Sequence, residues 1–218
     1  MNTSKWRKYD WPNHIWAAVD QISDRLANAW WTLYARGQMR AHGVRQVGQG
    51  FQASGYLHVL CRRNNSIVIG SHVKLVSRFR SNLVGLTNPM LLDTRFGGRI
   101  TIGDYSGLSG VVLSSRSSIT IGNYVKIGGN VRIFDHDFHA LNWEDRRHGS
   151  SDREKAGTAP VIIGNDVFIG TNAMILKGTE IGDRCIVAAG AVLAGKKIPP
   201  NSLVAGNPAQ ILGEKPTK

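Results

Sequence analysis

Residues 161–194 read VIIGNDVFIGTNAMILKGTEIGDRCIVAAGAVLA, and this stretch repeats every six residues. An aliphatic residue opens each repeat, and a small residue follows all but one of them. The aliphatic series is Ile163, Ile169, Ile175, Ile181, Val187 and Leu193; the residues that follow are Gly164, Gly170, Leu176, Gly182, Ala188 and Ala194. The same spacing occurs upstream at Ile121, Ile127 and Ile133, and Ile163 follows Ile121 by 42 residues, a whole number of repeats.

A period of six excludes a helix, whose period is 3.6 residues, and plain strand alternation does not explain the small residue after each aliphatic one. A hexapeptide period is typical of a parallel β-helix, in which three six-residue faces form one triangular coil of about 18 residues. The aliphatic side chains point inward and the small residues occupy the corners. Stacked coils then bury a column that no single coil buries alone. The sequence therefore predicts an all-β fold built on a parallel β-helix.

The run IGNDVFIGTNAMILKGTEIGDRCIVAAGAVL, followed by IPPNSLVAGNPAQIL, resembles the hexapeptide-repeat acyltransferases, and most of all the sugar O-acetyltransferases of surface-polysaccharide assembly. ITIGNYVKIGGNVRIFDHDFH extends the resemblance, which covers roughly residues 67–212. It implies a left-handed β-helix, acetyl-CoA as co-substrate, a carbohydrate acceptor and a homotrimer with coenzyme A (CoA) bound between subunits. It also leaves N-acetylation open beside O-acetylation, because an amine acceptor can use the same base.

We expect three segments: an N-terminal arm over 1–60, the β-helix over 61–212 with a loop insertion at 134–160, and a tail over 213–218. In the arm, apolar residues at helical spacing predict a helix that begins near Asp10 and Pro12 and ends near Gly37 or Gly43. This apolar series is Ile15, Val19, Ile22, Leu26, Trp30 and Leu33. The helix either caps the open end of the β-helix or lies on an anionic membrane surface through Lys5, Arg7, Lys8, Arg25, Arg36 and Arg40.

The chain of 218 residues has a net charge of +12, which favours anionic partners. No nucleic-acid motif is present, so we expect CoA and an acidic or lipid-linked glycan rather than DNA or RNA. Two cysteines, Cys61 and Cys185, exclude a disulfide scaffold and a four-thiolate zinc site. The sequence has neither a run of about 18 apolar residues nor a secretory leader, so we expect a cytoplasmic protein, with its arm at the inner face of the membrane as one alternative.

Residues 134–160 break the repeat and carry candidate catalytic side chains. Loops of this length in a compact fold are usually functional or disordered. A sugar hydroxyl needs a base to remove its proton, and a neutral histidine suits that task near neutral pH. A neighbouring carboxylate fixes the histidine tautomer and stabilises the imidazolium. The segment DHDFH supplies His136 and His139 together with Asp135 and Asp137.

The resemblance places the catalytic histidine at the start of this loop, and there we expect His139 rather than His136, with Asp135 or Asp137 orienting the base. Asp145, Arg146 and Arg147 are candidate acceptor contacts, because Arg binds carboxylates and phosphates in a bidentate manner. Ser109 lies where relatives place a polar acceptor contact.

The resemblance also assigns the CoA donor site to the later coils. Backbone groups at Gly170, Ala188 and Ala189 would hold the pantetheine arm. Asn207 and Pro208 would flank the adenine end. Lys196 or Lys197 would meet the phosphates.

Two other functions fit the same fold. A zinc enzyme of the γ-carbonic-anhydrase kind needs three histidines, with His148 or His72 joining His136 and His139. A non-catalytic glycan-binding scaffold needs none of them. We expect no metal, because neither His148 nor His72 lies in a recognisable ligand motif.

Overall fold

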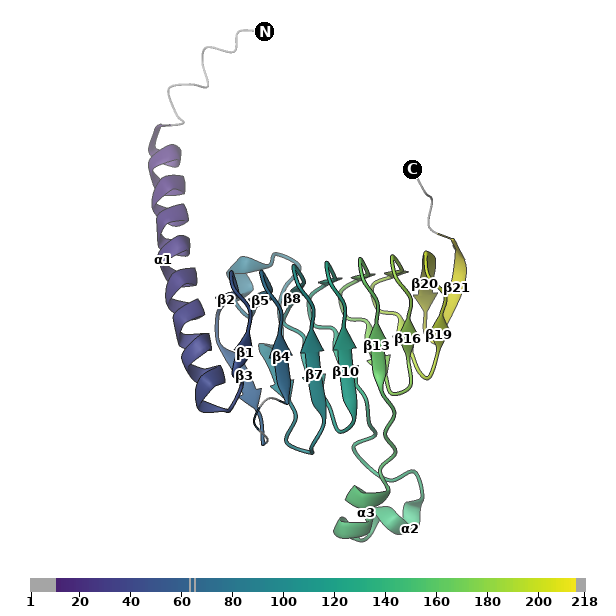
Figure 1. Cartoon of the computed structure of the whole chain (residues 1–218). Helices are drawn as coiled ribbons and strands as arrows, with labels where there is room; N and C mark the ends of the chain where they lie inside the picture. The colour runs from purple at the N-terminus through teal and green to yellow at the C-terminus, as the bar shows by residue number, and fades with distance from the viewer. Residues whose placement is uncertain (1–10, 63, 65, 215–218) are drawn as a thin grey trace.

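The computed structural model describes residues 11–62, 64 and 66–214, and three parallel sheets form the body of the molecule. The coils stack side by side into a triangular prism, with α1 at one end and the C-terminal strands at the other (Figure 1). The first sheet, sheet A, has the order β1-β4-β7-β10-β13-β16-β19, with bounds Gln46–Val47, Ile67–Ile69, Arg99–Ile102, Ser118–Ile121, Val161–Ile163, Glu180–Ile181 and Lys197–Ile198.

The other two sheets complete each coil. Sheet B has the order β2-β5-β8-β11-β14-β17-β20-β21, with bounds Gln52–Ser54, Lys74–Val76, Gly107–Ser109, Lys126–Ile127, Phe168–Ile169, Ile186–Val187, Ser202–Gly206 and Ala209–Glu214. Sheet C has the order β18-β15-β12-β9-β6-β3, with bounds Val192–Leu193, Met174–Leu176, Arg132–Phe134, Val112–Ser114, Met90–Asp93 and Leu57–Leu60. Only β20 and β21 pair antiparallel among these strands.

The hexapeptide prediction is confirmed by the core. Each of the six repeat positions from Ile163 to Leu193 is at most 2% exposed, and the column continues upstream through Ile121, Ile127 and Ile133. β10 pairs with β13 so that Ile121 lies beside Ile163, and the chain therefore recovers its register after the interruption. Cys185 lies in the same core and donates its thiol hydrogen to the Pro199 carbonyl at 3.1 Å.

The β-helix begins earlier than the expected boundary at residue 61. β1, β2 and β3 form a complete first coil, each pairing in parallel with the next strand of its sheet. The hexad positions of this coil are Val47, Ala53 and Val59, which pair with Ile69, Leu75 and Leu92 of the next coil. The six-residue spacing is therefore kept, but the small Ala53 interrupts the series of larger aliphatic residues.

α1 spans Trp11–Ala41, so Gly37 lies inside the helix and Gly43 follows its end with a positive φ of 80°. Ala35 and Met39 are fully buried against the first coil, which is how the helix covers the open end of the prism. The expected apolar face is directed elsewhere: Leu26 and Trp30 are 68% and 62% exposed. The expected helix start at Asp10 and the basic residues Lys5, Arg7 and Lys8 lie outside the described residues, as do positions 215–218 of the tail.

Two insertions leave the prism. The 3-10 helix η2 (Phe79–Ser81) lies between β5 and β6, and the helices α2 (Trp143–Arg146) and α3 (Gly149–Lys155) lie between β12 and β13. The second insertion projects from the edge between sheets C and A (Figure 1). Among the described residues, no helix is long and apolar enough to cross a bilayer.

Candidate active site

Asp135 is the buried anchor of the candidate site. The residue follows β12 directly and is fully buried. Its Oδ2 accepts hydrogen bonds from Ser115 Oγ at 2.6 Å and Ser117 N at 2.8 Å, and its Oδ1 accepts one from Arg116 N at 2.7 Å. Burial alone would raise the pKa of Asp135, but hydrogen bonds from His136, Ser115 and the two backbone N–H groups outweigh it and lower that pKa. The carboxylate is therefore ionised in the fold.

His136 is held by this carboxylate. Its Nδ1 lies 3.1 Å from Asp135 Oδ1, and because an ionised carboxylate only accepts, Nδ1 donates; in the neutral imidazole Nε2 then carries the lone pair. The imidazole is buried between Phe96 and Phe138, with ring centroids 6.1 and 4.7 Å away. Among the described residues, Nε2 has no hydrogen-bond partner. A buried polar atom without a partner is costly, and such atoms are found where a ligand or a reaction uses them.

His139 forms a second pair, with Asp152. His139 Nδ1 lies 2.7 Å from Asp152 Oδ2, and Ala140 N donates to Asp152 Oδ1, also at 2.7 Å. Both hydrogen bonds lower the pKa of Asp152, and the bond from His139 has the larger effect. The imidazole of His139 is 70% exposed. The short helix α3 brings Asp152 to His139 from 13 positions away in the sequence.

Both histidines line one cavity of about 460 Å³. Phe96 and Phe138 contribute apolar walls, and Arg116 and Arg153 contribute charge. The Arg116 guanidinium lies 5.8 Å from the Phe96 ring centroid and donates to the Arg153 carbonyl at 2.8 Å. The cavity therefore places two carboxylate-oriented imidazoles beside an apolar surface with two cations, a combination suited to a polar acceptor.

The other residues expected in this loop are engaged in its structure. Asp137 forms an ion pair with Lys177 Nζ. Asp145 accepts hydrogen bonds from Lys155 Nζ and Ser151 Oγ, both at 2.7 Å. Both bonds lower the pKa of Asp145, and the bond from Lys155 has the larger effect. Arg146 donates to the carbonyls of Ala140 and Leu141 at 2.8 and 2.7 Å, and Arg147 lies over the Trp143 ring at 4.3 Å. These contacts order the loop around the two histidines.

The residues expected to hold CoA lie mainly on a different edge of the prism. Gly170 follows β14, and Ala188 and Ala189 follow β17, so all three occupy the edge between sheets B and C. The two coils touch closely there, because a Cβ built on Gly170 would lie 2.5 Å from Ala189 N. Asn207 and Pro208 form the turn between β20 and β21. In one chain, sheet C separates this edge from the histidine loop.

Lys196 and Lys197 lie on the edge between sheets C and A, the same edge from which the histidine loop emerges. Lys197 Nζ is 3.1 Å from Glu180 Oε1, and the Lys197 side chain is 78% exposed. Ser109 ends β8 on sheet B, away from the histidines. The serine that meets the site is Ser115, which hydrogen-bonds Asp135.

Phe96, Arg116 and Asp152 were not expected as site residues. They come from a turn after β6, a turn after β9 and a short helix, and they carry no common sequence motif. Among the described residues, no group of three His, Cys, Asp or Glu side chains is arranged to hold a metal ion. The zinc hypothesis also loses His72 as a third ligand, since its ring stacks on Tyr105 with centroids 4.8 Å apart, at the edge between sheets A and B.

Comparison with known proteins gives matches along the repeat. Residues 160–195 match the family model described as bacterial transferase hexapeptide (six repeats). The putative lipopolysaccharide biosynthesis O-acetyl transferase WbbJ of Escherichia coli K12 is 32% identical over 120 residues, covering 54% of this chain and 58% of that protein. Galactoside O-acetyltransferase of the same organism is also 32% identical over 120 residues, covering 55% and 56%. The chain thus spans little more than half the length of these relatives.

Solved structures share the fold. A hexapeptide-repeat-containing acetyltransferase from Vibrio cholerae O1 biovar eltor, complexed with acetyl coenzyme A, is 26% identical with a TM-score of 0.55, covering 83% of this chain and 75% of that one. The N-acyltransferase AntD of Bacillus cereus reaches a TM-score of 0.64 at 19% identity, covering 84% and 90%, and supports the fold alone. The resemblance to hexapeptide-repeat acyltransferases and the left-handed parallel β-helix are therefore confirmed.

Proposed function

Because the chain carries the hexapeptide repeat and the fold of bacterial acetyltransferases, we propose that it is an acetyl-CoA-dependent O-acetyltransferase acting on a sugar hydroxyl, in a surface polysaccharide or its precursor. The observation that carries the proposal is the pair of carboxylate-oriented histidines in one cavity, at the point where the loop leaves the repeat. The solved relative that holds acetyl coenzyme A and the O-acetyltransferase relatives support the donor and the acceptor class.

The acceptor oxygen attacks the thioester carbonyl of acetyl-CoA as an imidazole takes the hydroxyl proton. The C–O bond forms, the C–S bond breaks, and the thiolate of CoA receives the proton from the imidazolium. Of the two histidines, we propose His136 as the base, although the sequence favoured His139. His136 has an unpartnered Nε2 and a buried, ionised carboxylate behind its Nδ1, which stabilises the imidazolium more in a water-poor site than at the exposed His139.

His139 then has a second role in our proposal, at the mouth of the cavity, where it meets the acceptor together with Arg116. Asp135 orients His136, and Asp152 orients His139. Asp137, Asp145, Arg146 and Arg147 hold the loop in place through the contacts described above. Neither cysteine is needed as a nucleophile; Cys185 lies in the core, and burial raises the pKa of its thiol.

The two edges of the prism argue for an assembly. Gly170, Ala188 and Ala189 lie on the B–C edge, whereas the histidines lie on the C–A edge. A complete site needs the histidine edge of one copy beside the B–C edge of another. A cyclic homotrimer satisfies this at every interface, because each copy offers both edges. We propose such a trimer, with CoA between neighbouring copies and the reaction on the cytoplasmic side of the membrane.

The decisive experiment combines binding with turnover. Calorimetric titration of the full chain with CoA should show saturable binding at about one per chain. Release of CoA from acetyl-CoA is then measured with hydroxyl-only sugars and, in parallel, amino sugars. Faster turnover of hydroxyl acceptors supports O-acetylation, and turnover restricted to amino sugars would assign N-acetylation instead. Absence of CoA binding would overturn the proposed function.

Two substitutions separate the roles of the histidines. His136→Ala should lower kcat by about 10²–10⁴-fold while CoA affinity stays similar. His139→Ala should raise KM for the acceptor and lower kcat less. His148→Ala is the matched control, since it removes a histidine of the same loop that does not line the cavity. A larger kcat loss in His139→Ala than in His136→Ala would return the base to His139.

A further inference from the structure

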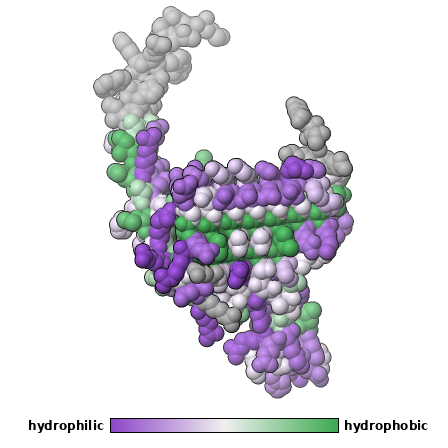
Figure 2. All heavy atoms as spheres, in the orientation of Figure 1, coloured by the Kyte–Doolittle hydropathy of each residue, from purple (hydrophilic) through white to green (hydrophobic). Residues whose placement is uncertain are grey.

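The largest apolar surface of α1 is directed away from the protein. Leu26 and Ala35 are nine residues apart, which is two and a half turns of an α-helix, so they lie on opposite sides. Ala35 is buried against the first coil and Leu26 is 68% exposed. Figure 2 shows the hydrophobic side chains along the outer side of the helix. This outer face consists of Trp16, Val19, Ile22, Leu26, Trp30 and Leu33, all of them exposed.

A basic groove runs beside this outer face. It lies between α1 and the first strands of sheet B, with a volume of about 760 Å³. Its walls are mostly apolar, and Leu33 of the outer face is one of them. Among the described residues that line it are three cations, Arg25, Arg36 and Lys74, and no carboxylate. The groove therefore joins an apolar surface to a concentration of positive charge.

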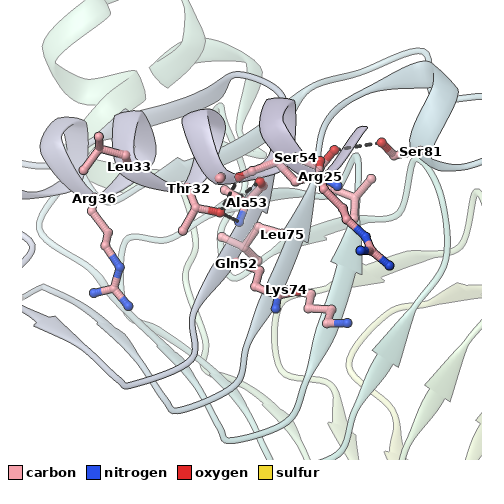
Figure 3. A pocket seen from close by; sticks show the side chains of 13 residues that line it. Arg25, Thr32, Leu33, Arg36, Gln52, Ala53, Ser54, Lys74, Leu75 and Ser81 are labelled. Carbon is pink, nitrogen blue, oxygen red and sulfur yellow. Dashed lines mark hydrogen bonds between the residues drawn. The ribbon is translucent and has the colours of Figure 1, made fainter. Parts of the chain in front are cut away.

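The three cations of the groove differ in their contacts. Arg36 is anchored, donating to the Gly48 carbonyl at 3.1 Å and lying 5.5 Å from the Phe51 ring centroid. Arg25 and Lys74 extend toward the same side of the groove in Figure 3. Two cations that line one groove repel each other, and an anion bound in the groove would offset that repulsion. Ser54 and Ser81 also line the groove, and their hydroxyl groups form a 2.7 Å hydrogen bond.

We propose that the outer face of α1 lies in the surface of an anionic bilayer, and that the groove receives the phosphate of a lipid through Arg25 and Lys74. An interfacial helix needs an apolar face with Trp and Leu, flanking cations and too little hydrophobicity to span the bilayer, and α1 has all three. The apolar side chains enter the boundary between headgroups and acyl chains, while the cations at the flank meet the phosphates.

Position in the fold agrees with this occupant. The outer face is at the N-terminal end of the prism, so the prism axis would stand on the membrane (Figure 1). Copies arranged with parallel axes around a symmetry axis would present every α1 on the same side. A second copy as the occupant is disfavoured on charge, because self-packing of this face would bring its own basic flank close to that of its partner without a carboxylate in the groove to compensate.

The test is co-sedimentation of the full chain with vesicles of phosphatidylcholine alone or mixed with phosphatidylglycerol. We expect binding to the mixed vesicles that weakens as salt is raised. Leu26→Glu should lower affinity by about tenfold or more, since it removes an apolar side chain that would enter the bilayer and adds a charge. Leu212→Glu is the matched control, because Leu212 is 64% exposed in β21, at the opposite end of the prism. This variant should bind vesicles like the parent chain.

A second pair of variants isolates the groove. Arg25→Gln combined with Lys74→Gln should lower affinity for the mixed vesicles by about 25-fold, at about fivefold for each cation. Lys126→Gln combined with Arg184→Gln removes the same charge outside the groove and should have a smaller effect. Equal binding to both vesicle types, or parent-like binding by Leu26→Glu, would overturn the proposal. The proposal would also be overturned if the parent chain did not bind vesicles and Leu26→Glu dissociated an assembly of the chain in sedimentation equilibrium. None of these results depends on transferase activity.

Discussion

Replacing Asp135 with Asn tests the site at its buried anchor. Asp135 accepts four hydrogen bonds, two on each carboxylate oxygen. The Asn side chain accepts on one oxygen only, so its preferred orientation keeps Arg116 N and His136 and turns its NH₂ group toward Ser115 and Ser117. Ser115 Oγ can then accept, because it has an alternative acceptor for its own hydrogen in the Arg99 carbonyl at 3.2 Å. The N–H of Ser117 has no such alternative and meets another donor.

The size of the effect follows from this count. One charge-assisted hydrogen bond is lost, its donor is left unsatisfied, and the bonds that remain lose the charge. Hydrogen bonds to charged groups contribute about 1.5–3 kcal/mol each, so we expect Asp135→Asn to lower the free energy of unfolding by about 2–4 kcal/mol. For a chain of this size that is about 4–15 °C in Tm. The His136 tautomer is retained, but the imidazolium formed during catalysis loses its counter-charge, so kcat should fall by about 10² or more.

Two assays read the same variant. Thermal unfolding followed by circular dichroism gives Tm, and release of CoA from acetyl-CoA gives kcat and KM. Asp183→Asn is the control, because Asp183 also accepts a backbone N–H of a neighbouring coil, from Asn165 at 2.7 Å, on an edge without the histidines. A parent-like kcat in Asp135→Asn with the expected loss of Tm would show that Asp135 is structural and would refute His136 as the base. An unchanged Tm would refute the hydrogen-bond reasoning itself.

Three further predictions concern acid stability and packing. The pKa values of Asp135 and Asp152 are lowered in the fold. Their contribution to the free energy of unfolding is therefore complete above the ordinary carboxyl pKa of 3.8, and it is lost as pH falls through the lower pKa values of the folded protein. The midpoint of urea unfolding should stay constant from about pH 6 to 5 and fall below about pH 4. Ile175→Ala should cost about 2–5 kcal/mol in urea unfolding because Ile175 is fully buried in the column, and a loss below about 1 kcal/mol would contradict its place there. Gly37→Ala should raise the free energy of unfolding by about 0.5–1 kcal/mol, because Gly37 lies inside α1 and a Cβ there meets nothing within 4 Å. Gly170→Ala should lower the free energy of unfolding, because its Cβ would meet Ala189 N. Equal Tm shifts in the two variants would contradict both expectations.

The sequence alone determined the repetitive part of this protein. Every hexad aliphatic from Ile163 to Leu193 is buried as the period requires, and Ile121 pairs with Ile163 across the interruption. The period is informative because every coil has the same local requirement. Each face needs one apolar residue that points inward, and each corner needs one small residue. A lost period is as visible in sequence as the period itself, and the chain leaves the repeat after β12 and rejoins it at β13.

Only the tertiary structure decided what sequence spacing does not encode. Asp152 reaches His139 through a short helix, and Ser115, Arg116 and Ser117 reach Asp135 from the preceding coil, because a β-helix places residues about one coil apart side by side. Strand pairing was needed to recognise the first coil, because its hexad residues Val47, Ala53 and Val59 include the small Ala53 and form only a short series. The direction of α1 was undetermined for a related reason. Helical periodicity shows that a helix has an apolar face, but which side packs on the protein depends on the complementary surface of the first coil, and here Ala35 and Met39 take that place while Leu26 and Trp30 are left outside.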